Sequence, residues 1–197
     1  MANQQTTQQT TQQTTQQSPY DLIGTVPSFA VTSTDVRDGE ELPTPQVSGI
    51  FGAGGTDTSP QLSWSGFPEG TKSFAVTMYD PTAPTASGFW HWAIADIPAS
   101  TTSLPTGAGD ENSTVLPSGA WHLTNDAGLK RFLGAAPPAG SGKHNYFIAV
   151  HALDVASIGI SRDASPAFLA FNMSFHTLAR GVIVPWWEAV HTSEVEQ

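Results

Sequence analysis

The feature that most constrains the fold is a pair of short runs in which both faces of a strand are apolar. In the run KSFAVTMYD, Phe74 and Val76 fall on one face while Ala75 and Tyr79 fall on the other. The run HNYFIAVHAL repeats this arrangement. Because successive side chains of a strand point to opposite sides, such runs are typical of strands at the centre of a sheet that is covered on both faces.

Further β-branched and aromatic runs, bounded by clusters of Gly, Pro, Asp and Ser, predict additional strands. They are SFAVTS (28–33), PQVSGIF (45–51), PQLSWS (60–65) and FWHWAIADI (89–97). The chain has 18 glycines and 15 prolines, and only 12% of its residues are charged, which favours turns and strands over long exposed helices. We therefore expect a mainly β fold of the β-rich α+β class.

One helix is predicted near the C-terminus, in the segment 164–184. Ser165 is a suitable N-cap and Pro166 suits the first helical position. Apolar residues then recur at helical spacing, namely Phe168, Phe171, Phe175, Leu178 and Val182. We expect this helix to lie across the β core, and we expect 101–118, which is rich in Gly, Pro, Ser and Thr, to be a long connection.

The chain of 197 residues is long enough for one domain with a sizeable core. The QQTT repeats near the N-terminus carry neither charge nor apolar side chains, so we expect 1–19 to be a disordered tail and 20–197 to be a single domain. The N-terminus has no basic region followed by an apolar one, and no run approaches the length of a membrane helix. A cytoplasmic location is the expectation.

Charge and cysteine content exclude several classes of function. The formal net charge of −10 disfavours binding to nucleic acid or to anionic membrane surfaces. The absence of cysteine excludes a disulfide framework, a thiolate nucleophile and a cysteine-based zinc site. No phosphate-binding loop, nucleophile elbow or HExxH motif is present, and GAGG at 52–55 is interpreted as a turn.

The candidate chemistry lies in three segments: Asp80 at the end of one predicted strand, His91 at the start of the next, and the run PPAGSGKHNY. Strand alternation puts His144 and Tyr146 on one face, with Pro138 in the preceding loop. Neighbouring strands would gather these groups in one small polar pocket. Two simpler interpretations remain: Asp80 before a proline also suits a turn, and His91 between two tryptophans also suits a hydrogen-bonded core histidine. We interpret the other histidines as structural, namely His122, His151, His176 and His191.

These residues suggest a site for a small anion. Without a lysine or arginine in the group, imidazole N–H, phenol O–H and loop N–H donors would hold the anion, with affinity in the micromolar range or weaker. Asp80 would orient His91 or His144 and raise its pKa, so the anion should bind better at pH 6 than at pH 8. The alternatives are a metal site or metal-free acid–base enzyme using Asp80, His91 and His144, and a protein-interaction module.

The segments DPTAP, FWHW and PPAGSGKHNY together resemble the phosphatidylethanolamine-binding protein family, in its bacterial Raf-kinase-inhibitor-like branch and its actinobacterial members. The resemblance extends from about Val26 to Glu188. It implies two stacked antiparallel sheets with a few peripheral helices and a pocket for phosphate-type head groups. It implies a binding protein rather than an enzyme, without a cofactor, with a kinase or protease as possible partner, and a homodimer.

The positions of the family motifs imply which residues of the three segments line the pocket, and they place Gly134 in the loop beneath it. The lining residues are Asp80, His91, Pro138, His144 and Tyr146. Three positions depart from the family pattern. Thr82 stands where a second aspartate is frequent, Asn145 where an arginine is frequent, and Ala136 where bacterial relatives have cysteine. These departures affect ligand charge and loop bracing, while the core pocket residues are intact.

Overall fold

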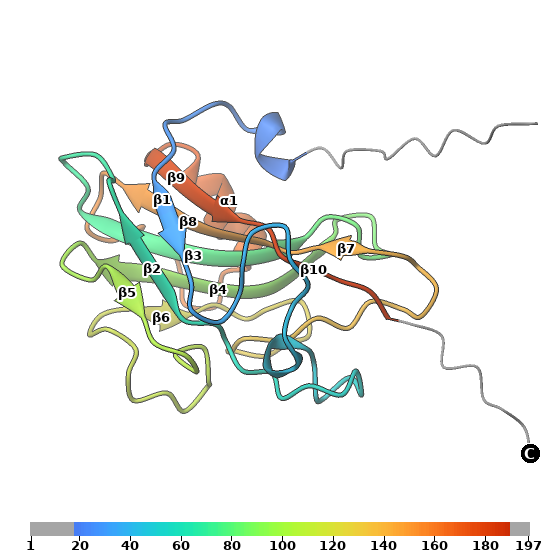
Figure 1. Cartoon of the computed structure of the whole chain (residues 1–197). Coiled ribbons are helices and arrows are strands. Elements are labelled where there is room, and N and C mark those ends of the chain that lie inside the picture. Colours follow the sequence, from blue (N-terminus) through green and yellow to red (C-terminus); the bar gives the residue numbers. More distant parts are fainter. Residues whose placement is uncertain (1–17, 190–197) are drawn as a thin grey trace, which may run out of the picture.

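The computed structural model describes residues 18–189 (Figure 1). The predicted tail at 1–19 therefore falls almost entirely outside the described residues, as does His191. The first described element, the 3-10 helix η1 (Pro19–Leu22), is capped by the Ser18 hydroxyl, which accepts a hydrogen bond from the backbone N–H of Tyr20.

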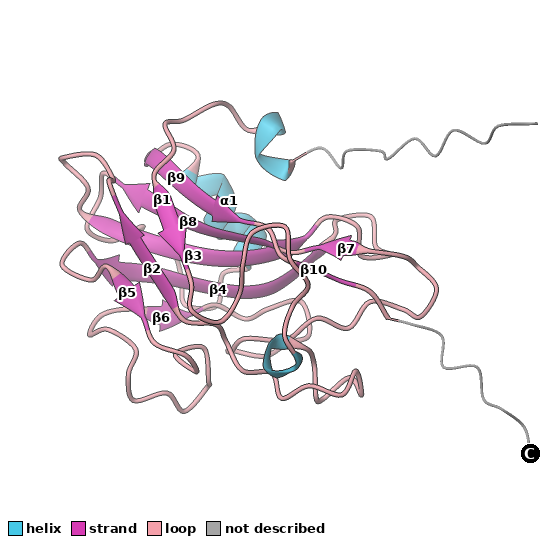
Figure 2. Ribbon diagram, viewed as in Figure 1, coloured by secondary structure: helices cyan, strands magenta, loops and turns pink. Residues whose placement is uncertain are grey.

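Within residues 18–189, ten strands form three antiparallel sheets (Figure 2). The largest sheet has the order β6-β4-β3-β8-β9, comprising β6 (Trp121–His122), β4 (Phe89–Pro98), β3 (Ser73–Asp80), β8 (Phe147–Leu153) and β9 (Thr177–Ile183). The second has the order β1-β2-β5, comprising β1 (Ala30–Thr32), β2 (Leu62–Ser65) and β5 (Ser103–Leu104). The third pairs β10 (Trp186–Trp187) with β7 (His144–Asn145). The helices besides η1 are η2 (Thr44–Gln46) and α1 (Pro166–Met173).

The five-stranded sheet is covered on both faces, as the apolar runs predict. One face packs against the three-stranded sheet through a core that includes Phe74, Val76 and Ile148. The other face packs beneath α1 through a smaller core that includes Ala75 and Leu169. The mainly β fold with peripheral helices is thereby confirmed.

Gly181 allows the small sheet to approach the large one closely. A Cβ atom at this position would lie 2.4 Å from Cγ2 of Val31 and 2.8 Å from the carbonyl oxygen of Phe29. The neighbouring Arg180 N–H donates to the carbonyl oxygen of Pro27 at 2.9 Å. The glycine therefore allows the residues just before β1 to pack directly against β9, next to Arg180.

The predicted C-terminal helix is correct at its start and wrong in its length. Ser165 accepts the N–H of Phe168 and Pro166 begins α1, but the helix ends at Met173 and residues 177–183 form β9. Pairing with β8 gives this segment ladder hydrogen bonds that its local periodicity did not reveal. The aromatic residues expected to face the core are instead half or more exposed, namely Phe168, Phe171 and Phe175.

The run PQVSGIF is the one predicted strand that does not form. Its first part belongs to η2, Val47 makes only an isolated bridge to Ala135, and residues 49–51 form a turn. Pro43 and Pro45 flank Thr44 at the start of η2, where fixed backbone angles favour a helical turn. The side chains of Ile50 and Phe51 are about half exposed as a result.

Candidate ligand-binding cavity

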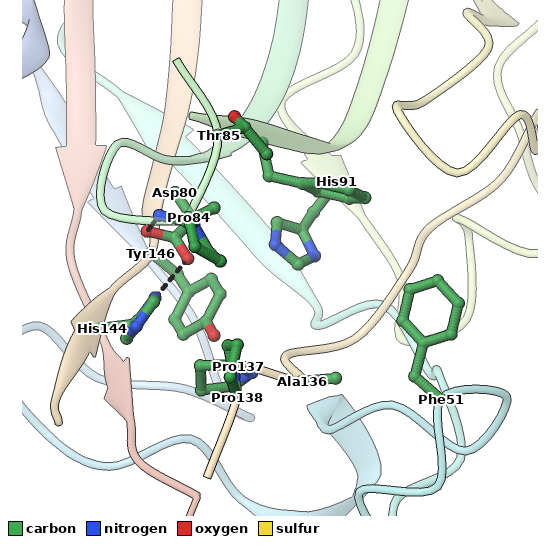
Figure 3. A pocket seen from close by; sticks show the side chains of 12 residues that line it. Phe51, Asp80, Pro84, Thr85, His91, Ala136, Pro137, Pro138, His144 and Tyr146 are labelled. Carbon is green, nitrogen blue, oxygen red and sulfur yellow. Dashed lines mark hydrogen bonds and ion pairs between the residues drawn. The ribbon is translucent and has the colours of Figure 1, made fainter. Parts of the chain in front are cut away.

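A cavity of about 230 Å³ lies where β3 ends and β4 begins, and the loop before β7 closes its other side (Figure 3). We call it the Asp80 cavity. Five of the six predicted site residues line it, namely Asp80, His91, Pro138, His144 and Tyr146. The remaining lining residues are Phe51, Ala83, Pro84, Thr85, Phe89, Ala136 and Pro137. The lining includes no lysine or arginine, so any positive charge in the cavity comes from a histidine.

A buried carboxylate–imidazole pair forms one wall. Oδ2 of Asp80 lies 2.7 Å from Nδ1 of His144, and both side chains are almost fully buried. Oδ1 of Asp80 accepts hydrogen bonds from the backbone N–H and the hydroxyl of Thr82 and from the N–H of Ala83. Asp80 therefore both caps the turn after β3 and orients His144, so its turn role and its site role coexist.

The hydrogen bonds of His144 account for both of its ring nitrogens. Nε2 of His144 lies 2.9 Å from the hydroxyl oxygen of Ser141, which in turn donates to the carbonyl oxygen of Pro138 at 2.7 Å. Since the single hydroxyl proton of Ser141 is directed to Pro138, the hydroxyl oxygen accepts a hydrogen bond from the Nε2–H group of His144. All these contacts, with Asp80 included, are satisfied together when the imidazole carries both ring protons. The pair is then an ion pair with no net charge.

His91 is buried, and its pKa is lowered rather than raised. Its Nδ1 lies 3.1 Å from the carbonyl oxygen of Leu133, so Nδ1 carries the proton and Nε2 is the atom that gains or loses one. Burial lowers the pKa of His91 and outweighs the attraction of Asp80. Asp80 does act to raise the pKa of His91, but desolvation of the ring dominates, so the expectation that this attraction keeps the ring protonated near neutral pH is wrong for His91.

Tyr146 supplies a donor with no partner among the described residues. Its hydroxyl is buried and makes no hydrogen bond there, although the residue lines the cavity. Burial, and to a lesser extent the charge of Asp80, raises the pKa of Tyr146, so the phenol stays protonated. The ring meets His91 edge to face, with centroids 5.2 Å apart.

Gly134 does not line the cavity but supports its floor. A Cβ atom there would lie 2.4 Å from the carbonyl carbon of Val47, so the close approach requires glycine. The N–H of Gly134 donates to Oδ1 of Asp57, whose Oδ2 accepts the N–H groups of Gly49 and Ile50. Burial acts to raise the pKa of Asp57, but these hydrogen bonds outweigh it and the pKa is lowered. Asp57 thus joins the loop before Phe51 to the loop that carries Gly134.

The apolar part of the cavity wall was not among the predicted site residues. Phe51 comes from a run interpreted as a strand, and Pro84 and Pro137 lie in loops. The repeated prolines in DPTAP and APPAG are the signal that could have indicated them, because proline lines a cavity without offering an N–H group.

The departures from the family pattern have local consequences. Thr82 donates twice to Asp80 and so braces the carboxylate without adding a charge. Ala136 lines the cavity with a methyl group in place of a thiol. Asn145 lies in β7 opposite Trp186 of β10.

The arrangement does not favour the metal-enzyme alternative. Within residues 18–189, no group of three or more His, Asp or Glu side chains is arranged to hold a metal ion. Oδ2 of Asp80 faces a ring proton of His144, and Nδ1 of His91 faces the carbonyl of Leu133, so these atoms are committed to one another and to the backbone.

Comparison with known proteins identifies the family. Residues 32–187 match the family model described as phosphatidylethanolamine-binding protein, so the chain belongs to this family. UPF0098 protein YbcL of Escherichia coli is 46% identical over 82% of this chain and 88% of its own, and YbhB of the same organism is 45% identical over 77% of this chain and 94% of its own.

Solved structures agree with this assignment. The crystal structure of E. coli YbcL, a member of the mammalian PEBP family, superposes with a TM-score of 0.79 at 46% identity, covering 82% of this chain and 98% of YbcL. The resemblance seen in the motifs is thereby confirmed, while its actinobacterial part stays a prediction. Among the described helices, none has the length and apolar character needed to cross a bilayer, and the cytoplasmic location stays a prediction.

Proposed function

We propose that the Asp80 cavity binds a small anion of the phosphate class, such as the head group of a phospholipid. The observation that carries the proposal is the Tyr146 hydroxyl, a buried donor with no partner among the described residues, on a residue that lines the cavity. Leaving a buried donor unpaired costs about 1 to 3 kcal/mol, and an acceptor on the ligand removes that cost. A charged acceptor adds a hydrogen bond worth about 1.5 to 3 kcal/mol.

His91 supports the proposal as a second, conditional donor. Its lowered pKa keeps Nε2 unprotonated near neutral pH. An anion beside the ring would favour the imidazolium form, since an opposite charge at close range favours the charged state. Binding would therefore take up a proton, and affinity would increase as the pH falls.

The size and charge of the cavity limit the ligand. Its volume of about 230 Å³ is below the range of roughly 300 to 1,000 Å³ that is typical of drug-sized ligands, so a head group fits better than a whole lipid. The Asp80–His144 pair adds no net charge, and a few hydrogen bonds offset by desolvation predict affinity that is micromolar or weaker. Modulation of a kinase or protease, and homodimer formation, stay predictions.

Titration calorimetry with O-phosphorylethanolamine tests the proposal. Tyr146→Phe should weaken binding by about tenfold or more, because it removes one donor to a charged acceptor. Tyr79→Phe is the matched control, since the Tyr79 hydroxyl donates to the carbonyl of Ser87 and does not line the cavity. Wild-type protein should bind more tightly at pH 6 than at pH 8 and take up a proton. Equal binding by wild type and Tyr146→Phe would refute the proposal.

A further inference from the structure

A second cavity lies on the other face of the five-stranded sheet, between η1, the sheet and α1. We call it the Arg180 cavity; its volume is about 250 Å³. Aromatic and apolar side chains form most of its wall, and Arg180 contributes the cation. The lining residues are Pro19, Tyr20, Leu22, Ile23, Tyr79, Trp90, His151, Ala170, Met173, Ser174, Thr177 and Arg180.

Arg180 is a buried charge without a carboxylate partner among the described residues. The residue is 9% exposed. The ion pairs within residues 18–189 join Lys130 to Asp163, His144 to Asp80 and His176 to Asp154, and none includes Arg180. A guanidinium stays protonated at neutral pH, so burial without a counter-ion is costly.

The groups that touch Arg180 are neutral. Its Nε–H donates to Nδ1 of His151 at 3.2 Å, so the ring proton of His151 lies on Nε2, which is 3.2 Å from the hydroxyl of Thr77. Burial, reinforced by the nearby guanidinium, lowers the pKa of His151 to about 3, so the ring stays neutral. The ring of Tyr20 lies over the guanidinium, with its centroid 4.3 Å from Cζ. The terminal guanidinium nitrogens make no hydrogen bond to the described residues.

No nearby part of the described chain offers the missing negative charge. Asp21 is the acidic residue of η1 itself, but it is exposed and does not line the cavity. Leu22 and Ile23 instead place apolar side chains at the cavity, where they are 78% and 49% exposed. The mouth is therefore apolar and the cation lies deeper.

From this arrangement we propose that the Arg180 cavity binds a small organic carboxylate with an apolar body. A planar guanidinium matches a carboxylate in two parallel hydrogen bonds, and one fixed positive charge balances one negative charge. The walls of Tyr20, Tyr79 and Trp90 suit an aliphatic or aromatic body. Residues 19–23, which supply part of this wall, lie before the region 32–187 that matches the family model.

Calorimetry with octanoate on the full chain tests this site, with 1-octanol as the uncharged match. Octanoate should bind saturably, and about tenfold or more tightly than octanol, since the guanidinium adds a charge-assisted contact. Arg180→Met should remove that preference. Arg37→Met, the same change at an exposed arginine, should leave it unchanged, and so should Tyr146→Phe in the Asp80 cavity.

A second variant keeps the test decisive if Arg180→Met does not fold. Leu22→Glu changes an exposed lining residue and places a carboxylate at the mouth, so octanoate should bind several-fold more weakly than to the neutral Leu22→Gln control. Equal binding of octanoate and octanol by wild type would overturn the proposal. Equal octanoate binding by the glutamate and glutamine variants would overturn it as well.

Discussion

The two cavities lie on opposite faces of one sheet and handle a buried charge in opposite ways. Alternation along the strands separates them: Asp80 and His91 face one cavity, while their neighbours Tyr79 and Trp90 face the other. In the Asp80 cavity the charge is paired with an imidazole inside the protein. In the Arg180 cavity it is supported only by neutral groups of the described chain. The paired charge therefore stabilises one wall of its cavity, whereas the unpaired charge is available for the carboxylate proposed above.

The largest effect should come from removing the paired carboxylate. Asp80→Ala leaves His144 without its partner and leaves the N–H groups of Thr82 and Ala83 without an acceptor. Breaking a buried pair in this way costs about 3 to 5 kcal/mol of unfolding free energy. Urea denaturation measures it, with the exposed Asp163→Ala as control. A loss below 1 kcal/mol would mean that the pair is not what stabilises this wall.

The next effect is a loss of stability in acid. His151 has a folded pKa of about 3 against an ordinary value of 6.5, and burial also lowers the pKa of His91. The folded state then binds fewer protons than the unfolded state, so stability is full above pH 6.5 and is lost as the pH falls towards 3. His151 alone contributes about 1.4 kcal/mol per pH unit in that window.

Replacement of His151 isolates this effect. His151→Gln should reduce the slope of unfolding free energy against pH between 6 and 4 by about one proton. His176→Gln is the control, because His176 is partly exposed and paired with Asp154. Urea titrations at several pH values measure the slopes, and parallel slopes for wild type and His151→Gln would contradict the assignment.

A small effect is expected where the charge is unpaired. Arg180→Met removes a buried charge that has no counter-ion among the described residues, while it also leaves Nδ1 of His151 without a donor. Removing the unpaired charge stabilises the folded state, and losing the donor to His151 destabilises it, so the unfolding free energy should change by about 1 kcal/mol or less. A loss of several kcal/mol in denaturation would show that Arg180 is structural, which would remove the contrast with Asp80.

The smallest effect concerns the outer face of α1, the helix beside the Arg180 cavity. Phe171 is 61% exposed, so Phe171→Ser should change unfolding free energy by about 0.5 kcal/mol or less. Leu169 on the inner face is fully buried, and Leu169→Ala should cost about 2 to 5 kcal/mol. Thermal unfolding of both variants compares the two faces. Similar losses of unfolding free energy would mean that Phe171 packs against the core as Leu169 does.

Local sequence patterns determined the central strands, the cap at Ser165 and the grouping of Asp80, His91 and His144. Alternation and capping depend on residues close together in the chain, so they can be predicted from it. The family motifs added Gly134, whose tight packing against Val47 is consistent with a supporting role in the loop.

Only the tertiary structure decided that residues 177–183 form a strand, that His91 is desolvated and that Arg180 is buried without a counter-ion. Strand pairing of β9 with β8 joins residues about thirty positions apart, and its hydrogen bonds outweigh a local helical periodicity. Desolvation likewise depends on every group packed around a side chain, so neither the pKa of His91 nor the isolation of Arg180 could be inferred from neighbouring residues. A helix prediction over 164–184 also concealed Arg180, because it gave that residue no place in a sheet.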